Sequence, residues 1–257
     1  MTAKIIAIAL QKGGVAKTTV TRHLGQSIAQ AGRRVLLVDL DPQASLTSIV
    51  GAIGEAGSMF DVLGDVEAGW DDVIPIIERV DDRLDIAPAH ADLAHTDAGL
   101  VLRRAREYVL RRSLGTVVDR YDYILLDCPP SLGLLLSNAL IAAQWVIIPT
   151  LLDSMSLKSI GLFLDTLDAM ERDYPDVAGI LGTVAVAADM RTVLARAMLE
   201  ELRGRERLRM FDTVIPATVR FPEAALMQQS IFAYAPDHAG AVAFEELTRE
   251  LLSRVEA

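Results

Sequence analysis

The sequence predicts an α/β fold: a doubly wound, mostly parallel sheet with helices on both faces. Short apolar runs alternate along the chain with helical patterns, which is typical of parallel strands joined by crossover helices. Most of these runs are continuously apolar, which favours strands that are buried on both faces. The chain has 257 residues, of which 51% are hydrophobic, so we expect residues 1–257 to form a single domain with one core.

The expected strands come from apolar runs at residues 5–10, 35–38, 84–87, 123–126, 145–148, 180–187 and 213–215. The expected helices cover residues 18–31, 100–118, 133–143, 158–172, 192–203 and 239–255. In the last of these, Phe244, Leu247 and Leu251 recur at helical spacing. The stretch 51–82 is the least regular, and we expect it to be a mobile insertion.

Composition excludes several classes of protein. The net charge of −10 argues against a constitutive nucleic-acid binder. The single cysteine, Cys128, excludes a disulfide framework and a cysteine-only metal cluster within one chain. Neither a signal peptide nor a run long enough to span a membrane is present, so we expect a soluble, cytoplasmic protein without membrane contact.

A glycine-containing loop gives the strongest functional signal. Lys12-Gly13-Gly14-Val15-Ala16-Lys17-Thr18-Thr19 follows an apolar strand and opens a helix, which is the context of a phosphate-binding loop. Its backbone N–H groups would face the phosphates of ATP. Lys17 would reach the β- and γ-phosphates, and the Thr18 hydroxyl would bind Mg²⁺. Gln11 and Ala16 occupy the glycine positions of the common loop pattern, so the alternative is a glycine-rich turn with chance lysines.

Aspartates end two of the expected strands. Asp39 and Asp41 follow the run 35–38, and Asp127 follows the run 123–126. Side chains alternate along a strand, so Asp39 and Asp41 can face the same way, toward the ligand crevice at the carboxyl end of the sheet. The alternative for Asp41 is that it caps a helix. Cys128, beside Asp127, is interpreted as a small buried side chain and not as a nucleophile.

These motifs resemble those of the ParA/MinD family of ATPases. The loop resembles the family's deviant Walker A motif, Asp39-Leu40-Asp41-Pro42-Gln43 matches its second loop, and Asp127 with Pro129-Pro130-Ser131 resembles its Walker B segment. The resemblance implies a Mg²⁺-dependent ATP hydrolase that forms a homodimer with ATP, in which Lys12 reaches the partner's nucleotide. It implies catalytic roles for Lys12, Lys17 and Asp41, with Asp41 orienting the attacking water.

The same resemblance implies further site residues. Asp39 would support Mg²⁺ and the loop, and Asp127 would hold Mg²⁺ through water. Residues 214–216 and their surroundings resemble the adenine-side loop, where Pro216 and Val184 are adenine candidates by position. The family usually has glycine at the position of Ala16, and a right-handed helical backbone there would tolerate the methyl group.

The resemblance is greatest to the short, chromosome-type ParA proteins. Residues 245–256 carry four Glu and two Arg, unlike the basic membrane helix of MinD relatives. Only eleven residues precede Lys12, so we expect no N-terminal helix-turn-helix domain. Short ParA proteins bind double-stranded DNA non-specifically as ATP dimers and partition chromosomes or plasmids with a ParB-like activator, which implies a nucleoid-associated protein.

Arginines supply the candidate DNA contacts. Residues 191–220 hold seven Arg and four acidic residues, and residues 101–112 hold five Arg and one Glu. Arg220 is the first candidate, followed by Arg191, Arg196 and Arg203. The alternative is an arginine-rich face that is simply solvated. Three other functions stay open: positioning of a protein or organelle cargo, an ATP-dependent enzyme acting on a small molecule, and a binding scaffold with a decayed site.

Overall fold

The computed structural model describes residues 2–64 and 72–256. An eight-stranded sheet runs through it in the order β3-β4-β2-β5-β1-β6-β7-β8. Neighbouring strands are parallel except for β3 and β4, which pair antiparallel at one edge. The strands are β1 (Lys4–Ile8), β2 (Val35–Asp39), β3 (Glu78–Asp81), β4 (Leu84–Ala87), β5 (Tyr123–Asp127), β6 (Trp145–Thr150), β7 (Gly179–Ala188) and β8 (Val214–Pro216).

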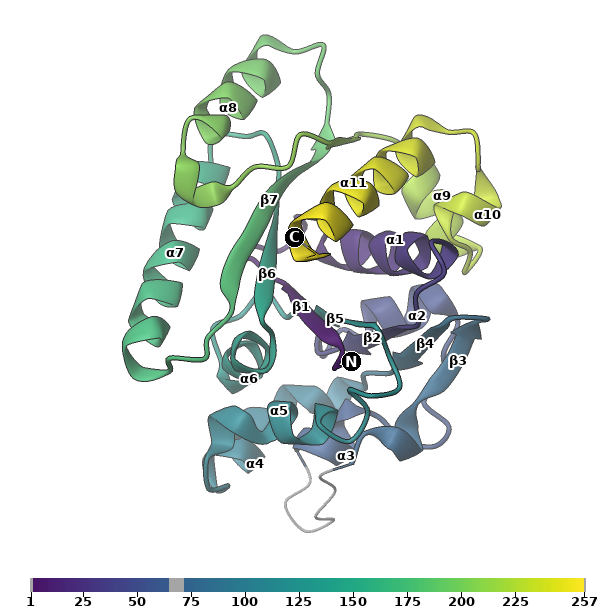
Figure 1. The fold of residues 1–257 in the computed structure, drawn as a ribbon, viewed down its shortest axis with the longest axis vertical. Coiled ribbons are helices and arrows are strands. Elements are labelled where there is room, and N and C mark those ends of the chain that lie inside the picture. Colours follow the sequence, from purple (N-terminus) through teal and green to yellow (C-terminus); the bar gives the residue numbers. More distant parts are fainter. Residues whose placement is uncertain (1, 65–71, 257) are drawn as a thin grey trace.

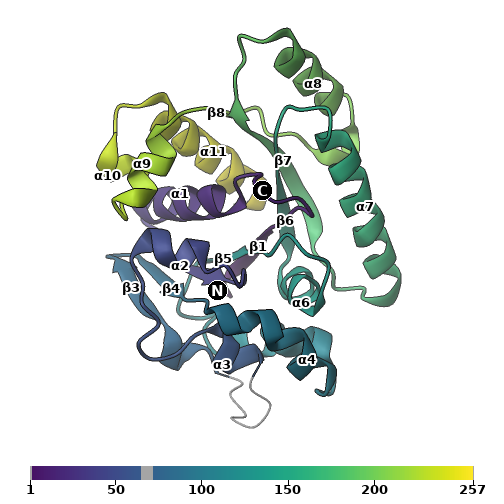
Figure 2. The same ribbon diagram turned by 180° about the vertical axis from the view of Figure 1, so that it is seen from behind.

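Helices cover both faces of the sheet, as the continuous apolar strands predict (Figures 1 and 2). The α-helices are α1 (Lys17–Gln30), α2 (Ser45–Val50), α3 (Met59–Leu63), α4 (Thr96–Val101), α5 (Val109–Leu114), α6 (Leu134–Ala142), α7 (Ser156–Asp173), α8 (Val193–Arg203), α9 (Arg220–Leu226), α10 (Ile231–Tyr234) and α11 (Ala239–Glu256). Short 3₁₀ turns lie at η1 (Ile74–Ile76), η2 (Ala91–His95), η3 (Arg106–Tyr108) and η4 (Glu206–Leu208).

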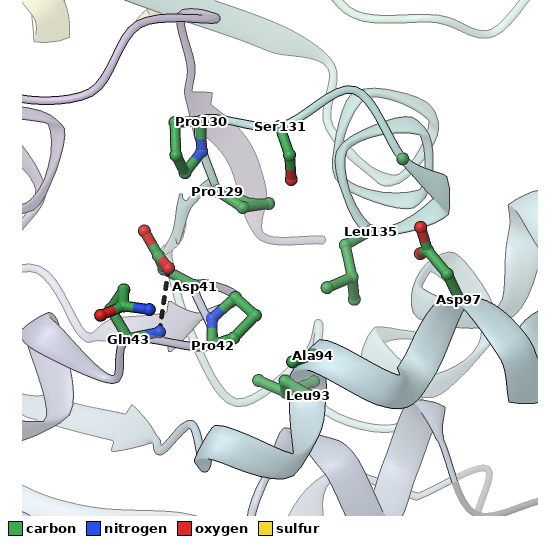
Figure 3. A pocket seen from close by; sticks show the side chains of 11 residues that line it. Asp41, Pro42, Gln43, Leu93, Ala94, Asp97, Pro129, Pro130, Ser131 and Leu135 are labelled. Carbon is green, nitrogen blue, oxygen red and sulfur yellow. Dashed lines mark hydrogen bonds between the residues drawn. The ribbon is translucent and has the colours of Figure 1, made fainter.

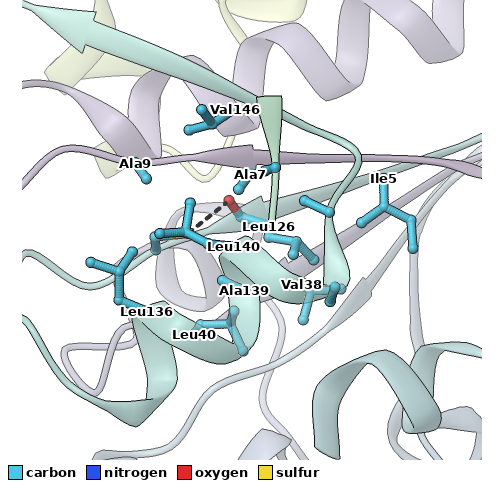
Figure 4. Close-up of a cluster of buried hydrophobic side chains, with 14 of the residues drawn as sticks. Ile5, Ala7, Ala9, Val38, Leu40, Leu126, Leu136, Ala139, Leu140 and Val146 are labelled. Carbon is cyan, nitrogen blue, oxygen red and sulfur yellow. Dashed lines mark hydrogen bonds between the residues drawn. The ribbon is translucent and has the colours of Figure 1, made fainter. Parts of the chain in front are cut away.

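Each strand contributes side chains to two cores because successive residues point to opposite faces. Ile6 and Ile8 of β1 pack with α1 and α11, whereas Ile5 and Ala7 pack with α5, α6 and α7. Figure 4 shows part of the second core, where Leu136 and Leu140 of α6 lie against the central strands. Burial on both sides fixes the register of β1, β2 and β5, and therefore the positions of the residues that follow them.

The doubly wound, mostly parallel sheet is confirmed, and all seven expected strands exist. The additional strand, β3, escapes prediction because it is a four-residue edge strand whose alternate residues are exposed. The expected single helix over residues 100–118 is wrong. The chain turns at Ala105, which has a left-handed φ of 48°, and then forms η3 and α5.

The stretch 51–82, expected to be irregular, contains α3, η1 and β3, while residues 65–71 lie outside the described residues. Within the described part of the chain, no helix is both long enough and apolar enough to cross a membrane.

Candidate ATP site

The residues predicted to bind the phosphates and Mg²⁺ meet at the carboxyl ends of β1, β2 and β5, which are adjacent in the centre of the sheet. Asp127 pairs in register with Ile8 on one side and with Asp39 on the other. The chain leaves β1 through the loop 9–16 and enters α1 at Lys17. In a parallel α/β sheet this is where ligands bind, at the edge where the first connection opens a helix.

The phosphate loop has two left-handed residues, Gly14 with φ 73° and Ala16 with φ 59°. The right-handed helical backbone that would tolerate the methyl group is therefore not present at Ala16, and the alanine occupies a conformation that glycine adopts at lower cost. Among the described residues, no side chain caps the start of α1. Its first N–H groups therefore remain available to an anion.

A cavity of about 490 Å³ opens onto this loop. Its lining begins with residues 13–19 and continues with Asp41, Gln43, Ser45, Ile49, Pro130, Phe221, Pro222 and Ala225. All the residues predicted to hold the phosphates thus line one cavity.

Lys17 lies at the base of the loop with only 7% of its surface exposed. Its Nζ donates hydrogen bonds to the carbonyl oxygens of Lys12 at 3.2 Å and Leu10 at 3.4 Å. Burial lowers the pKa of the Lys17 ammonium, while the nearby Asp127 carboxylate opposes that shift. A buried ammonium held by two carbonyl groups suits an anion such as the phosphate chain of ATP.

The carboxyl group of Asp127 is buried and faces the first turns of α1. It accepts hydrogen bonds from the hydroxyl groups of Thr18 at 2.7 Å and Thr21 at 3.3 Å. Burial, together with repulsion from Asp39, raises the pKa of Asp127. A divalent cation beside Thr18 and Asp127 would relieve this unfavourable negative charge, so these residues fit the oxygen ligands that Mg²⁺ prefers.

Asp39 has a different environment. Its Oδ2 accepts hydrogen bonds from the Thr47 backbone N–H at 2.9 Å and the Thr47 hydroxyl at 2.8 Å, and its Oδ1 accepts one from the Asp41 N–H at 3.1 Å. Burial raises its pKa. The geometry favours a positioning role for Asp39, in which it fixes Asp41 and the start of α2.

Asp41 is half-exposed and accepts a hydrogen bond from the Gln43 N–H at 3.0 Å. The alternative of helix capping is wrong, because α2 begins at Ser45 behind a left-handed Ala44 that carries no side-chain cap within the described residues. The carboxylate lines both the loop cavity and a second cavity of about 340 Å³. Figure 3 shows Asp41 and Asp97 on opposite sides of this second cavity, with Ser131 at its margin.

Lys12 points to an acid that the sequence analysis missed. Its Nζ lies 2.9 Å and 3.1 Å from the two carboxylate oxygens of Asp153, in the loop between β6 and α7. Asp153 also accepts hydrogen bonds from the Met155 N–H and the Ser156 hydroxyl. A carboxylate three residues beyond an apolar strand end was the available signal, since β6 is adjacent to β1.

A smaller apolar cavity of about 170 Å³ continues from the loop toward the adenine candidates. Pro216 lines it, together with Ala16, Thr19, Val186, Phe221 and Phe244. Val184, by contrast, is fully buried in the core, two residues before Val186 on β7. The structure therefore brings Pro216 to the cavity wall and leaves Val184 behind it.

The four candidate DNA contacts do not form one cluster. Arg191 and Arg196 lie near the start of α8, Arg203 at its end, and Arg220 at the start of α9, on another part of the molecule (Figures 1 and 2). Arg220 pairs with Glu223 at 2.8 Å and Arg191 with Asp189 at 2.8 Å. These ion pairs are exposed and therefore weak, so phosphate groups can compete for the arginines.

Comparison with known proteins agrees with this geometry. Residues 3–177 match the AAA domain family. The Soj protein of Bacillus subtilis, a sporulation initiation inhibitor, is 39% identical over 96% of this chain and 98% of its own length. The chromosome-partitioning ATPase Soj of Thermus thermophilus is 36% identical over 98% of this chain and 96% of its own length.

A solved structure is also similar over nearly its whole length. The protein described as cobyrinic acid a,c-diamide synthase from Mycobacterium smegmatis, with an ATP analogue and magnesium bound, aligns with a TM-score of 0.85 and 33% identity over 99% of this chain and 96% of that one. The phosphate loop, the paired carboxylates and these relatives all indicate the same family. The chain belongs to the AAA domain family, as a ParA/Soj-type ATPase that binds ATP with Mg²⁺ and hydrolyses it.

Proposed function

We propose that this ATPase is an ATP-dependent dimer switch that binds double-stranded DNA without sequence preference. In this proposal it partitions chromosomes or plasmids with a ParB-like activator protein, in the cytoplasm and on the nucleoid. The relatives named for chromosome partitioning support this assignment. The observation that carries it is the orientation of Lys12.

Lys12 is part of the loop motif, yet its ammonium group is directed at Asp153 and the lining of the loop cavity begins at Gly13. The Lys12 side chain is 21% exposed and its partner Asp153 is 41% exposed. An ion pair this open is worth at most about 1 kcal/mol. Lys12 can therefore exchange Asp153 for the phosphates of a nucleotide held by a second copy of the chain, which is a stronger, multiply charged partner.

Within one chain, each of the remaining site residues would have a separate role in hydrolysis. Lys17 and the N–H groups at the start of α1 would hold the phosphates, and Thr18 with Asp127 would hold Mg²⁺, which supplies positive charge to the transition state. Asp41 would orient the attacking water, since its carboxylate is half-exposed and reaches the same cavity. Asp39 would fix Asp41 through the latter's backbone N–H.

The placement of Arg220 suggests how nucleotide could control DNA binding. The next residue, Phe221, lines both the loop cavity and the apolar cavity. The Phe221 ring also packs against His23 of α1, with ring centroids 5.2 Å apart. Nucleotide that fills these cavities would therefore fix the start of α9, and with it the guanidinium group of Arg220.

One observation favours a second candidate, an ATP-dependent enzyme that acts on a small carboxylic acid. The cavity of about 340 Å³ shares Asp41 with the loop cavity and is within the size range of small-molecule sites. The solved structure described as a cobyrinic acid diamide synthase has the same fold.

The affinity for duplex DNA, measured with and without ATP, tests the proposal, and phosphate release is followed in the presence and absence of DNA. We expect DNA to bind only with ATP, with an affinity that falls steeply with salt because counterions are released. Arg220→Glu should weaken DNA binding for all sequences, while Arg172→Glu, an equal charge change at the end of α7, should not. If the wild-type chain binds DNA in no nucleotide state, the partitioning proposal fails and the small-molecule candidate gains weight.

A further inference from the structure

Four arginines gather at the opposite end of the sheet from the ATP site. Arg34 directly precedes β2, Arg83 directly precedes β4, Arg79 lies on β3, and Arg120 lies three residues before β5. They line a cleft of about 400 Å³ together with Asp82, Asp85 and Tyr121. Ligands of parallel α/β sheets normally bind at the carboxyl ends of the strands, so a basic cleft at the amino ends is not accounted for by the ATPase fold.

Two of these arginines have a structural role. Arg34 pairs with Asp122 at 2.9 Å and also donates its backbone N–H to that carboxylate. The Nε atom of Arg79 lies 2.8 Å from Asp85. These contacts tie β2 to β5 and β3 to β4, so the two side chains form fixed walls of the cleft.

The guanidinium groups of Arg83 and Arg120 differ from these. Among the described residues, neither makes a hydrogen bond or an ion pair, and both residues are exposed. Asp85 is not readily available to pair with Arg83 or Arg120, because its carboxylate already contacts Arg79 and accepts a hydrogen bond from the Tyr121 hydroxyl at 2.7 Å. Asp82 is the other acid in the lining, and Asp122 is held by Arg34, so three carboxylates accompany the four guanidinium groups.

We propose that this cleft binds a small anion with two or more phosphate groups, held chiefly by Arg83 and Arg120. Guanidinium groups match phosphate oxygens with paired N–H donors, and here they come from two separate strands. The volume is that of a small-molecule site. A concave cleft suits such a small ligand better than the convex backbone of duplex DNA. The site is independent of DNA binding at Arg220.

Inorganic tripolyphosphate is the probe, titrated calorimetrically into the full chain with ADP and Mg²⁺ in excess. A fluorescent ADP analogue reports whether the phosphate loop stays filled. We expect one tripolyphosphate to bind per chain while the analogue remains bound. The double variant Arg83→Gln with Arg120→Gln should weaken this binding by about tenfold or more, because charge-assisted hydrogen bonds are lost.

The matched control is Arg104→Gln with Arg112→Gln, which removes the same charge from two other exposed arginines. It should bind tripolyphosphate like the wild type, and both doubles should keep wild-type ADP affinity. The single variants Arg83→Gln and Arg120→Gln, each expected to weaken binding, replace the double if it fails to fold. The proposal is overturned if tripolyphosphate binds only by displacing the ADP analogue, if both doubles behave alike, or if Arg83 and Arg120 affect only duplex DNA.

Discussion

Replacing Ala16 by glycine should stabilise the protein, although alanine to glycine changes usually destabilise. Ala16 has φ 59° and ψ 28°, which is left-handed backbone. An L-residue with a side chain pays about 1–2 kcal/mol for that conformation. Glycine removes this strain, but it also makes the unfolded chain more flexible, which lowers the free energy of unfolding by about 0.4–1 kcal/mol. The difference leaves a net stabilisation of about 0.5–1 kcal/mol.

Thermal unfolding of the nucleotide-free protein measures this effect. For a chain of this size the gain corresponds to a rise in Tm of about 1–4 °C. Ala105→Gly is the matched control, because Ala105 has a φ of 48° but is exposed and lies away from the loop. It should give a similar rise in Tm and leave ADP affinity unchanged.

A bulkier residue should have the opposite effect at the same position. Ala16→Val should lower Tm strongly, since β-branched residues are rarely found at positive φ. If Ala16→Gly instead lowers Tm while Ala105→Gly raises it, the reasoning from left-handed strain at residue 16 is refuted. The methyl group would then stabilise the folded state through packing against the cavity.

The other predictions concern charges in the site. Lys17→Ala should abolish ATP binding in calorimetry, because it removes the buried ammonium from the phosphate site; unchanged affinity would refute the loop assignment. Lys12→Ala should keep nucleotide binding by the monomer but prevent ATP-dependent dimerisation, as size-exclusion chromatography would detect; a normal dimer contradicts the role across the interface. Asp41→Ala should bind ATP without hydrolysing it and accumulate the dimer on DNA, whereas normal phosphate release would exclude Asp41 as the water-orienting residue. Without Mg²⁺, stability should fall as pH rises above about 4, because burial raises the folded-state pKa of Asp127 above its unfolded value, so the folded state keeps a proton that the unfolded chain loses. Melting curves from pH 5 to 8 check this, and Asp127→Asn should flatten the slope.

The sequence predicted those features that depend on local signals. Continuous apolar runs identified the central strands, and a carboxylate directly after such a run identified Asp39 and Asp127. Their proximity followed from topology alone, because adjacent parallel strands bring their carboxyl ends together. The structure gives this proximity a register, with Asp39 directly opposite Asp127.

Features that depend on neighbours distant in sequence could not be predicted. Asp153 lies 141 positions from Lys12, so its place after an apolar strand did not by itself reveal their pairing. The left-handed backbone at Ala16 follows from the path between β1 and α1, not from the preference of alanine. Charge counts likewise identified the arginines near 191–220 but not their pairing with Glu223 or Asp189, which decides how much charge is free.

The charges around the loop also favour binding of the metal together with the nucleotide. Asp39 and Asp127 are buried side by side, Asp41 lies beside them, and Lys17 is the buried cation that faces them. Lys12, the other lysine of the motif, is engaged by Asp153. Each carboxyl group of this cluster that loses its proton adds negative charge where a phosphate chain, itself negative, has to bind. Mg²⁺ held by Thr18 and Asp127 would offset that repulsion, and Lys17 with the N–H groups of α1 would hold the rest of the phosphate chain.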